Sequence, residues 1–219
     1  MGVRQIGARV HRVEDDNLIR GEGKYLDDIQ LPNMGYAAFL RSSMAHAKIS
    51  ITDTEAARTL DGVQAVFTYD TLPSSLLSKT QLETYPAPII KQSMCPELLA
   101  NDEVAHVGQA IAMVIANTRH VAEDACELIQ VEYTPLTPVV DVIKAAKSDS
   151  QLTHSSLKDN IAASIETKFG DVETAFEECE DSIELSFKQH RGGCHSMECR
   201  GVLGDWQQQS GELTLYSST

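Results

Sequence analysis

Long apolar runs and basic residues are scarce in this sequence. The longest apolar run, Ala110-Ile-Ala-Met-Val-Ile-Ala116, has the length of a strand and is far shorter than the roughly 20 residues of a membrane-spanning helix. Lys and Arg number 18 against 32 Asp and Glu, so the formal net charge is −14. Nucleic acids and anionic membranes require clustered basic side chains, so the charge balance argues against both as partners.

Cysteine pairs are missing as well. The five cysteines are an odd number and include no CxxC motif, which favours a reducing compartment and predicts a cytoplasmic protein. Residues 1–16 lack the apolar core of a secretory signal peptide. The content of 42% hydrophobic and 23% charged residues is typical of globular proteins and excludes a disordered, collagen-like or coiled-coil chain.

Strands and helices alternate in the predicted secondary structure of the first 140 residues, which suggests layered α/β packing. Apolar patterning predicts strands at 36–40, 48–52, 63–69, 104–116 and 131–133. The first strand is expected to be buried, and the fourth to be central and buried on both faces. Helices are predicted at 53–60, capped by Thr52 or Asp53, and after Asn117 or Thr118, where apolar residues recur at helical spacing as far as Ile129.

The remaining sequence is divided by a polar stretch at 139–160, which has the composition of a linker. Before it, prolines at 73, 86, 88 and 96 predict a surface excursion over 70–103. After it, a helix is expected to begin at Gly170-Asp171, and Ile183-Glu-Leu-Ser-Phe187 alternates as a strand does. Turn residues between 202–206 and 212–216 predict a hairpin.

Potential metal ligands are densest near the C-terminus of the sequence, where His190, Cys194, His195 and Cys199 follow one another closely. Imidazole and thiolate groups can form a tetrahedral zinc site. The spacing H-x3-C-H-x3-C differs from that of zinc fingers and ribbons, so these residues could equally be ordinary strand or loop residues of a larger protein.

Catalytic motifs are incomplete. There is no G-x-S-x-G turn, and Cys194, beside Arg191 and His195, is a weak candidate for a reactive thiol. The glycines at 21 and 23, and those at 192 and 193, lack the following helix that would bind a phosphate. The residues alone therefore assign no catalytic, cofactor-binding or metal-binding side chain.

Several motifs nevertheless occur in a recognisable order. They are Gly21-Glu-Gly-Lys-Tyr-Leu-Asp-Asp28 with Arg41-Ser-Ser-Met-Ala-His-Ala-Lys-Ile49, then Val107-Gly-Gln-Ala-Ile-Ala-Met-Val-Ile-Ala116 with Val131-Glu-Tyr-Thr-Pro-Leu136, then Phe169-Gly-Asp-Val-Glu-Thr-Ala-Phe176, and Gln189-His-Arg through Met197-Glu198. In this order they resemble the beginning of the large subunit of the molybdenum hydroxylases, the family of carbon monoxide dehydrogenase, aldehyde oxidase and xanthine dehydrogenase.

The resemblance implies an α+β fold with an N-terminal segment at 1–17, an α/β-hammerhead domain at 18–140, a linker at 141–160 and the incomplete beginning of a molybdopterin-binding domain at 161–219. The family's molybdenum-cofactor loops come later than these residues. The resemblance therefore implies that this chain is an N-terminal fragment or split piece of the large subunit, which binds no cofactor and is inactive alone. The alternative is a non-catalytic structural or interaction remnant of such a subunit.

In the complete enzyme, the resemblance implies a molybdopterin-type molybdenum cofactor, with 2Fe–2S and FAD on partner subunits or domains. The expected partners are the remainder of the molybdopterin subunit, an iron–sulfur subunit and a flavin subunit. Glu198 and Arg191 are the residues expected nearest the cofactor pocket, in a structural rather than catalytic role. Unpaired strand edges and an uncovered apolar face predict self-association or partner binding.

Overall fold

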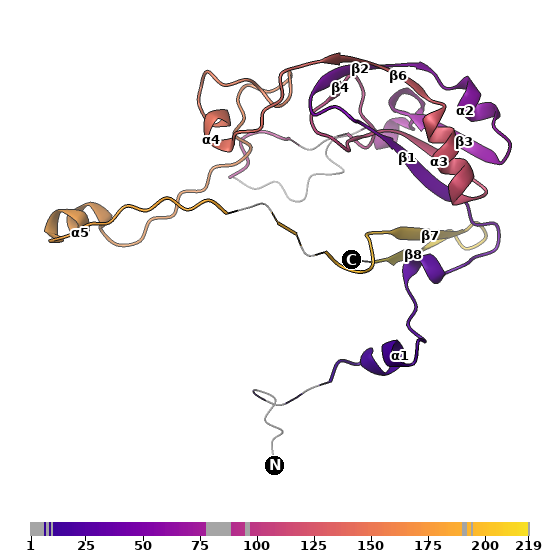
Figure 1. Ribbon diagram of the computed structural model, residues 1–219, viewed down its shortest axis with the longest axis horizontal. Coiled ribbons are helices and arrows are strands. Elements are labelled where there is room, and N and C mark those ends of the chain that lie inside the picture. Colours follow the sequence, from indigo (N-terminus) through magenta and orange to yellow (C-terminus); the bar gives the residue numbers. More distant parts are fainter. Residues whose placement is uncertain are drawn as a thin grey trace. The chain divides into compact units, whose positions relative to one another are not determined.

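The computed structural model describes residues 7, 9, 11–77, 89–94, 97–189, 192–193 and 195–218 (Figure 1). The chain divides into two compact units. One comprises Met34–Glu180, and the other combines Met1–Asn33 with Asp181–Thr219. Each unit has its own sheet structure and is described separately.

The unit Met34–Glu180 contains two three-stranded antiparallel sheets. In the first sheet, β5 (Ala110–Ala116) lies between β1 (Tyr36–Arg41) and β3 (Val63–Thr68). Met113 of β5 is paired with a phenylalanine from each neighbouring strand. The sequence predicts a central strand over 104–116, and the central position is confirmed for Ala110–Ala116. By contrast, β1 is not buried as expected, because its residues alternate between half-buried and exposed.

Helices α2 (Glu55–Thr59) and α3 (Arg119–Glu127) pack against the first sheet. The side of α3 that enters the core carries the small residues Ala122, Ala125 and Cys126, which allow the helix to approach the strands closely. The complete buried cluster comprises Ala57, Val66, Ala112, Val114, Ala116, Ala122, Ala125, Cys126 and Ile129.

The predicted cap of α3 is confirmed, whereas α2 begins at Glu55, two residues later than predicted, and the side chain of its N-cap Thr54 makes no capping hydrogen bond. Thr118 Oγ1 accepts a hydrogen bond from Val121 N at 3.3 Å at the start of α3. At α2, Asp53 Oδ1 accepts from Glu55 N at 2.8 Å, so Asp53 rather than Thr52 binds the first turn. These side chains satisfy backbone N–H groups that have no partner within the helix.

The second sheet has the order β4-β2-β6, with β4 at Glu103–Val104, β2 at Ala47–Asp53 and β6 at Gln130–Pro135. A second buried cluster lies against it and comprises Ala47, Ile49, Ala100, Val104 and Ile111. Ile111 belongs to β5 of the first sheet, so this residue connects the two sheets through their apolar sides.

The prediction of one strand from 104 to 116 is wrong. The run is split into β4 and β5, which belong to different sheets. The chain turns between them at Gly108, whose φ is +88°. Buried Gln109 stabilises the turn, because its Oε1 accepts from Ala105 N at 2.8 Å and its carbonyl accepts from Ser42 N at 2.9 Å.

The excursion predicted for 70–103 contains two short 3-10 helices, η2 (Tyr69–Thr71) and η3 (Ser74–Leu76). Its last part is not a surface segment, because Leu99 and Ala100 are buried. Three of the four prolines used in the prediction, at positions 86, 88 and 96, lie outside the described residues.

The polar stretch expected to be a linker has an ordered structure. Helix α4 (Val142–Ala145) lies within it. Asn160 Nδ2 donates to the carbonyl oxygens of Ala145 and Gln151 and to Ser150 Oγ, at 2.8 to 3.1 Å. One amide side chain therefore organises the loop. The domain limits inferred from the sequence stay a prediction.

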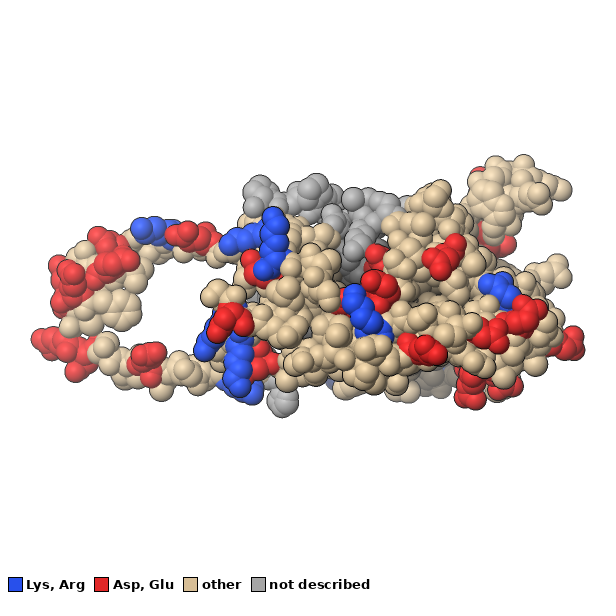
Figure 2. Space-filling model, turned by 90° about the horizontal axis from the view of Figure 1, so that it is seen from above, with Lys and Arg blue, Asp and Glu red and all other residues tan. Residues whose placement is uncertain are grey.

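Helix α5 (Val172–Glu178) begins where the sequence predicts, with Asp171 Oδ1 accepting from Thr174 N at 3.2 Å. The helix itself carries Glu173, Glu177 and Glu178, and Figure 2 shows acidic side chains gathered around it. The prediction of a strand at 183–187 is wrong. These residues form no strand in the described structure, and Ile183 and Phe187 are 86% and 88% exposed. An alternating segment forms a strand only when a neighbouring strand pairs with it.

The second unit includes α1 (Asp15–Ile19), the 3-10 helix η1 (Leu26–Asp28) and a hairpin. The predicted hairpin is confirmed as β7 (Val202–Gln207) and β8 (Glu212–Ser217), closed by Gly211 with a φ of +70°. Its larger apolar side chains are poorly covered, since Trp206 and Leu215 are each 61% exposed. A two-stranded hairpin is only marginally stable without a covering layer.

Candidate functional site

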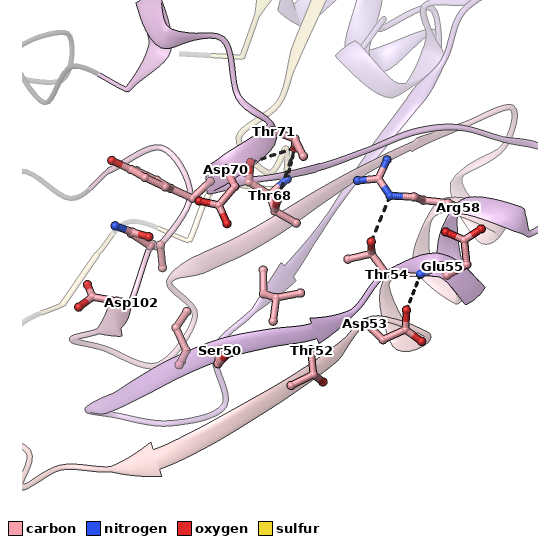
Figure 3. Close-up of a pocket in the computed structure, with 15 residues that line it drawn as sticks. Ser50, Thr52, Asp53, Thr54, Glu55, Arg58, Thr68, Asp70, Thr71 and Asp102 are labelled. Carbon is pink, nitrogen blue, oxygen red and sulfur yellow. Dashed lines mark hydrogen bonds between the residues drawn. The ribbon is translucent and has the colours of Figure 1, made fainter.

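A polar groove of about 580 Å³ lies beside β2 within the unit Met34–Glu180 (Figure 3). Strand β2, helix α2, the 3-10 helix η2 and the loop before β4 supply its walls. The residues that line it are Ile49, Ser50, Ile51, Thr52, Asp53, Thr54, Glu55, Arg58, Thr68, Tyr69, Asp70, Thr71, Ala100, Asn101 and Asp102.

Most polar contacts in this groove are local and hold secondary structure together. Arg58 Nε donates to Thr54 Oγ1 at 3.1 Å across one turn of α2. Thr71 Oγ1 accepts from Thr68 N at 2.8 Å and donates to Thr68 O at 3.1 Å, which closes η2 (Figure 3). These groups therefore stabilise the turns of α2 and η2.

The groove carries more negative than positive charge, with four carboxylates and one guanidinium among its lining residues. It contains no histidine or cysteine, so it has no pairing of a nucleophile with an imidazole base. Across the described residues of the whole chain, no group of three or more His, Cys, Asp or Glu side chains is arranged to hold a metal. Among its lining residues, the groove therefore offers neither a nucleophile–imidazole pair nor a metal-ligand cluster.

A second polar cluster is centred on buried His46, which precedes β2. Its Nδ1 lies 2.9 Å from the carbonyl oxygen of Thr137, and its Nε2 lies 2.8 Å from Glu103 Oε1. The other carboxylate oxygen of Glu103 accepts from Lys48 Nζ at 2.8 Å. Ser155 N donates to Glu103 Oε1 at 2.9 Å. One carboxylate thus joins β2, β4 and the loop at 155.

These contacts alter the ionisation of the cluster. Burial by itself would raise the pKa of the Glu103 carboxyl, but hydrogen bonds from Lys48, His46 and Ser155 outweigh burial and lower this pKa to about 2. Lys48 is affected in the opposite direction, because its hydrogen bond to Glu103 raises the pKa of its amine. Glu103 is therefore a carboxylate near neutral pH, and it accepts hydrogen bonds from three separate segments.

Sequence reasoning did not identify this cluster. Its two central residues, His46 and Glu103, are separated by 57 positions, so no local motif connects them. A weak signal exists in the pairing of Lys48 with Glu103, since opposite charges favour facing positions on neighbouring strands.

The candidate residues near the C-terminus are not assembled into a site by the described structure. His195 and Cys199 are exposed, whereas His190, Arg191 and Cys194 lie outside the described residues. The zinc hypothesis therefore stays open. Glu198 has a structural contact within its unit, where its Oε1 accepts from Leu26 N at 2.7 Å. This hydrogen bond connects the segment before β7 to the N-terminal segment.

Two antiparallel sheets, the first of them packed against two short helices, joined to a segment with a hairpin, define an α+β protein of the hammerhead type. The model of the aldehyde oxidase and xanthine dehydrogenase a/b hammerhead domain matches residues 20–137, and that of the molybdopterin cofactor-binding domain matches residues 151–219. The chain belongs to the aldehyde oxidase and xanthine dehydrogenase family. The family and fold class predicted from the sequence motifs are confirmed.

The similar proteins include the large subunits of two oxidoreductases. The large subunit of nicotine 6-hydroxylase from Paenarthrobacter nicotinovorans is 35% identical over 98% of this chain and 26% of its own length. The large chain of carbon monoxide dehydrogenase from Afipia carboxidovorans is 32% identical over 97% of this chain and 27% of its own length. The chain therefore spans about a quarter of these relatives and corresponds to part of a large subunit.

Solved structures agree with the sequence comparison. Quinoline 2-oxidoreductase from Pseudomonas putida 86 matches with a TM-score of 0.83 and 29% identity over 97% of this chain and 27% of its own. The copper- and molybdenum-containing carbon monoxide dehydrogenase matches with a TM-score of 0.77 and 31% identity over the same shares. These similarities support the arrangement of elements described above.

Membership of this family implies a molybdenum cofactor in the complete enzyme. In the described residues, neither the groove nor the segment around His195 forms a set of donors that fits such a group. No reaction step is therefore assigned to these side chains. None of the described helices is both long enough and apolar enough to cross a membrane.

Proposed function

We propose that this chain forms the hammerhead domain and the first part of the cofactor-binding domain in the large subunit of a molybdenum-dependent dehydrogenase or oxidase. The carbon monoxide, aldehyde and xanthine types are the candidate classes. The observation that carries the proposal is the similarity to large subunits along nearly the whole chain, at 35% and 32% identity.

We propose that these residues provide a structural framework for the large subunit and do not carry out its redox chemistry. Two buried clusters stabilise the paired sheets of the unit Met34–Glu180, and the groove is lined by groups engaged in capping. In enzymes of this kind, the cofactor carries the redox chemistry and the protein positions it. We therefore expect turnover only when the rest of the large subunit is present.

The proposed partners are the remainder of the molybdopterin subunit, an iron–sulfur subunit with 2Fe–2S and a flavin subunit with FAD. The relatives support association with other subunits, since one is subunit gamma of the 6-hydroxypseudooxynicotine dehydrogenase complex. Exposed apolar side chains on β7 and β8 favour contact with further protein, including a second copy of this chain. A cytoplasmic location is proposed from the odd cysteine count, and the described cysteines, Cys126, Cys179 and Cys199, are free thiols.

Purification from the native source tests this proposal. The chain would be tagged in its own gene, and the purified material analysed by mass spectrometry, metal analysis and molybdopterin fluorescence. We expect co-purifying polypeptides that bring molybdenum, iron and flavin in constant ratio to the tagged chain. The recombinant chain alone is the control, and we expect it to contain no molybdopterin.

Two results would contradict the proposal. Native chain that purifies alone, without molybdenum, iron or flavin, would favour the non-catalytic remnant of a large subunit. Stoichiometric molybdopterin or turnover of an aldehyde, purine or carbon monoxide by the recombinant chain alone would show that it is a complete catalytic unit.

A further inference from the structure

We propose that the hammerhead region carries a docking surface onto which the beginning of the cofactor-binding region folds. The docking surface comprises residues 89–92 and Glu103, which lie in the part of the chain that matches the hammerhead model. It holds residues 155–164, which lie in the part that matches the cofactor-binding model. All of these residues belong to the unit Met34–Glu180, and the proposal does not depend on the reaction that the complete enzyme catalyses.

Backbone hydrogen bonds form the first part of the contact. An isolated antiparallel bridge joins the two segments. Lys91 N donates to Ala162 O at 2.8 Å, and in the opposite direction Ser164 N donates to Ile89 O at 3.0 Å. Reciprocal bonds of this kind fix the register of the two segments, but a pair of strands without further support is only marginally stable. Side chains must therefore supply the rest of the anchoring.

The side chain of Gln92 provides a donor at the end of this bridge. Its Nε2 donates to the carbonyl oxygen and to Oδ1 of Asp159, both at 2.8 Å, and to the carbonyl oxygen of Ile161 at 3.2 Å. Carbonyl and carboxylate oxygens only accept hydrogen bonds, so these three atoms require a donor at position 92. Asp159 Oδ1 also accepts from Ile161 N at 2.8 Å, so Gln92 binds a turn that is closed within the docked segment.

Glu103 anchors the other end of the docked segment. Its Oε1 accepts a hydrogen bond from Ser155 N at 2.9 Å. Lys48 Nζ donates to the second oxygen of the same carboxylate at 2.8 Å and keeps it in place. Because Lys48 lies on β2 and Glu103 on β4, this anchor is built on the second sheet rather than on a loop.

The two anchors act on one loop because Asn160 joins their binding points. Asn160 Oδ1 accepts from Thr153 N at 2.8 Å, and its Nδ2 donates to Gln151 O at 2.8 Å. These bonds connect the turn that Gln92 binds to the residues before Ser155. Loss of either anchor should therefore loosen the loop as a whole.

The docked segment has no hydrophobic core of its own. All residues from 138 to 180 are described, and none of them is buried. Both buried clusters consist of residues between 47 and 129, in the hammerhead region. Burial of apolar surface is the main favourable contribution to folding, so residues 155–164 depend on the hammerhead for their order. We infer that this stretch folds with the hammerhead, although it matches the model of the next domain.

Hydrogen exchange on the full chain tests the docking surface, with peptides that cover 157–164 compared between the wild type and three variants of Gln92. Gln92→Met has a similar length but no donor, so these peptides should exchange about tenfold faster. Gln92→Glu places a carboxylate before three acceptors and should speed exchange at least as much. Gln92→Lys retains a donor, in the form of an ammonium group, and should keep most of the protection.

A fourth variant and two controls complete the test. Glu103→Ala removes the second anchor, and exchange at 153–158 should rise about tenfold. Gln209→Met makes the same change as Gln92→Met at an exposed residue of the hairpin turn, and it should leave exchange at 157–164 unchanged. Peptides from 110–116 in β5 report on the fold of the hammerhead and should exchange as in the wild type in every Gln92 variant.

The proposal is overturned if Gln92→Met exchanges like the wild type at 157–164, or if Gln92→Lys loses as much protection as Gln92→Met. In either case, hydrogen-bond donation from position 92 would not hold the segment. An equal loss of protection in β5 would also overturn it, because the whole unit would then be destabilised rather than the docked segment.

The wild type alone provides a test that needs no variant to fold. Its peptides from 157–164 should exchange more slowly than those from 183–187, which have no strand partner among the described residues, and faster than those of β5. Equal exchange of 157–164 and 183–187 would show that the docking surface confers no order and would refute the proposal.

Discussion

Lys48 and Glu103 are direct partners across β2 and β4, with 2.8 Å between Lys48 Nζ and Glu103 Oε2. Strand β4 has only two residues and makes few backbone contacts. The side chain of Glu103 adds hydrogen bonds to His46 and to the Ser155 amide, so it anchors this short strand at several points. A cross-strand ion pair of this kind also fixes the register of the two strands.

The first prediction concerns stability in acid. The folded-state pKa of Glu103 is lowered from 4.5 to about 2, so the ionised carboxyl stabilises the fold above its unfolded pKa. This contribution is lost progressively as the pH falls from about 4.5 towards 2. Urea unfolding of the wild type and of Glu103→Gln across this range should show a steeper loss of stability in the wild type. Parallel curves for the two proteins would contradict the prediction.

The second prediction concerns the contact between the two sheets. Ile111 is fully buried and belongs to the cluster beside the second sheet, although its strand lies in the first. Ile111→Ala should lower the free energy of unfolding by about 2–5 kcal/mol, through lost burial and the cavity that remains. Ile183→Ala is the matched control, since Ile183 is exposed. Denaturant unfolding should show a change for the control within about 0.5 kcal/mol.

Local sequence signals predicted most of the elements correctly. The cap and the apolar periodicity of α3 placed this helix to within a few residues, because its apolar stripe faces a single sheet. The hairpin of β7 and β8 was also recognisable, since turn residues and alternation act over short distances. These elements depend on interactions between residues that are close in sequence.

The errors arose where distant residues decide the structure. The run from 104 to 116 is apolar enough for one strand, but the bonds of Gln109 to Ala105 and Ser42 turn the chain and divide the run between two sheets. In the segment 183–187, alternation alone did not produce a strand, because no neighbouring described strand pairs with it. The His46–Glu103 cluster was missed for the same reason, since only the fold brings its members together.

The third prediction tests the cap of α3. Thr118 Oγ1 accepts from Val121 N at 3.3 Å, and the helix packs its alanine side on the first sheet. Thr118→Ala should lower the free energy of unfolding by about 1 kcal/mol, because a backbone N–H loses its partner. Thr118→Ser keeps the hydroxyl and should retain most of the stability. Similar losses in both variants would show that the methyl group, and not the hydrogen bond, is responsible.

The final prediction compares local stability along the chain by hydrogen exchange. Amides of β5 are paired on both sides, and most of the side chains of this strand are buried, so they should exchange only through extensive unfolding. Amides at 183–187 have no strand partner among the described residues, and their apolar side chains are exposed. We expect peptides from 160–217 to exchange much faster than those from 104–134.

Self-association is the main process that could hide this difference, because a second copy of the chain could cover the exposed apolar side chains of 183–187 and of the hairpin. The exchange should therefore be measured over a dilution series, with the oligomeric state followed by light scattering. If association protects this region, the protection must fall as the protein is diluted, whereas that of β5 must not. Protection of 183–187 equal to that of β5 in a monomeric sample would contradict the prediction, because a segment with no strand partner among the described residues should exchange quickly.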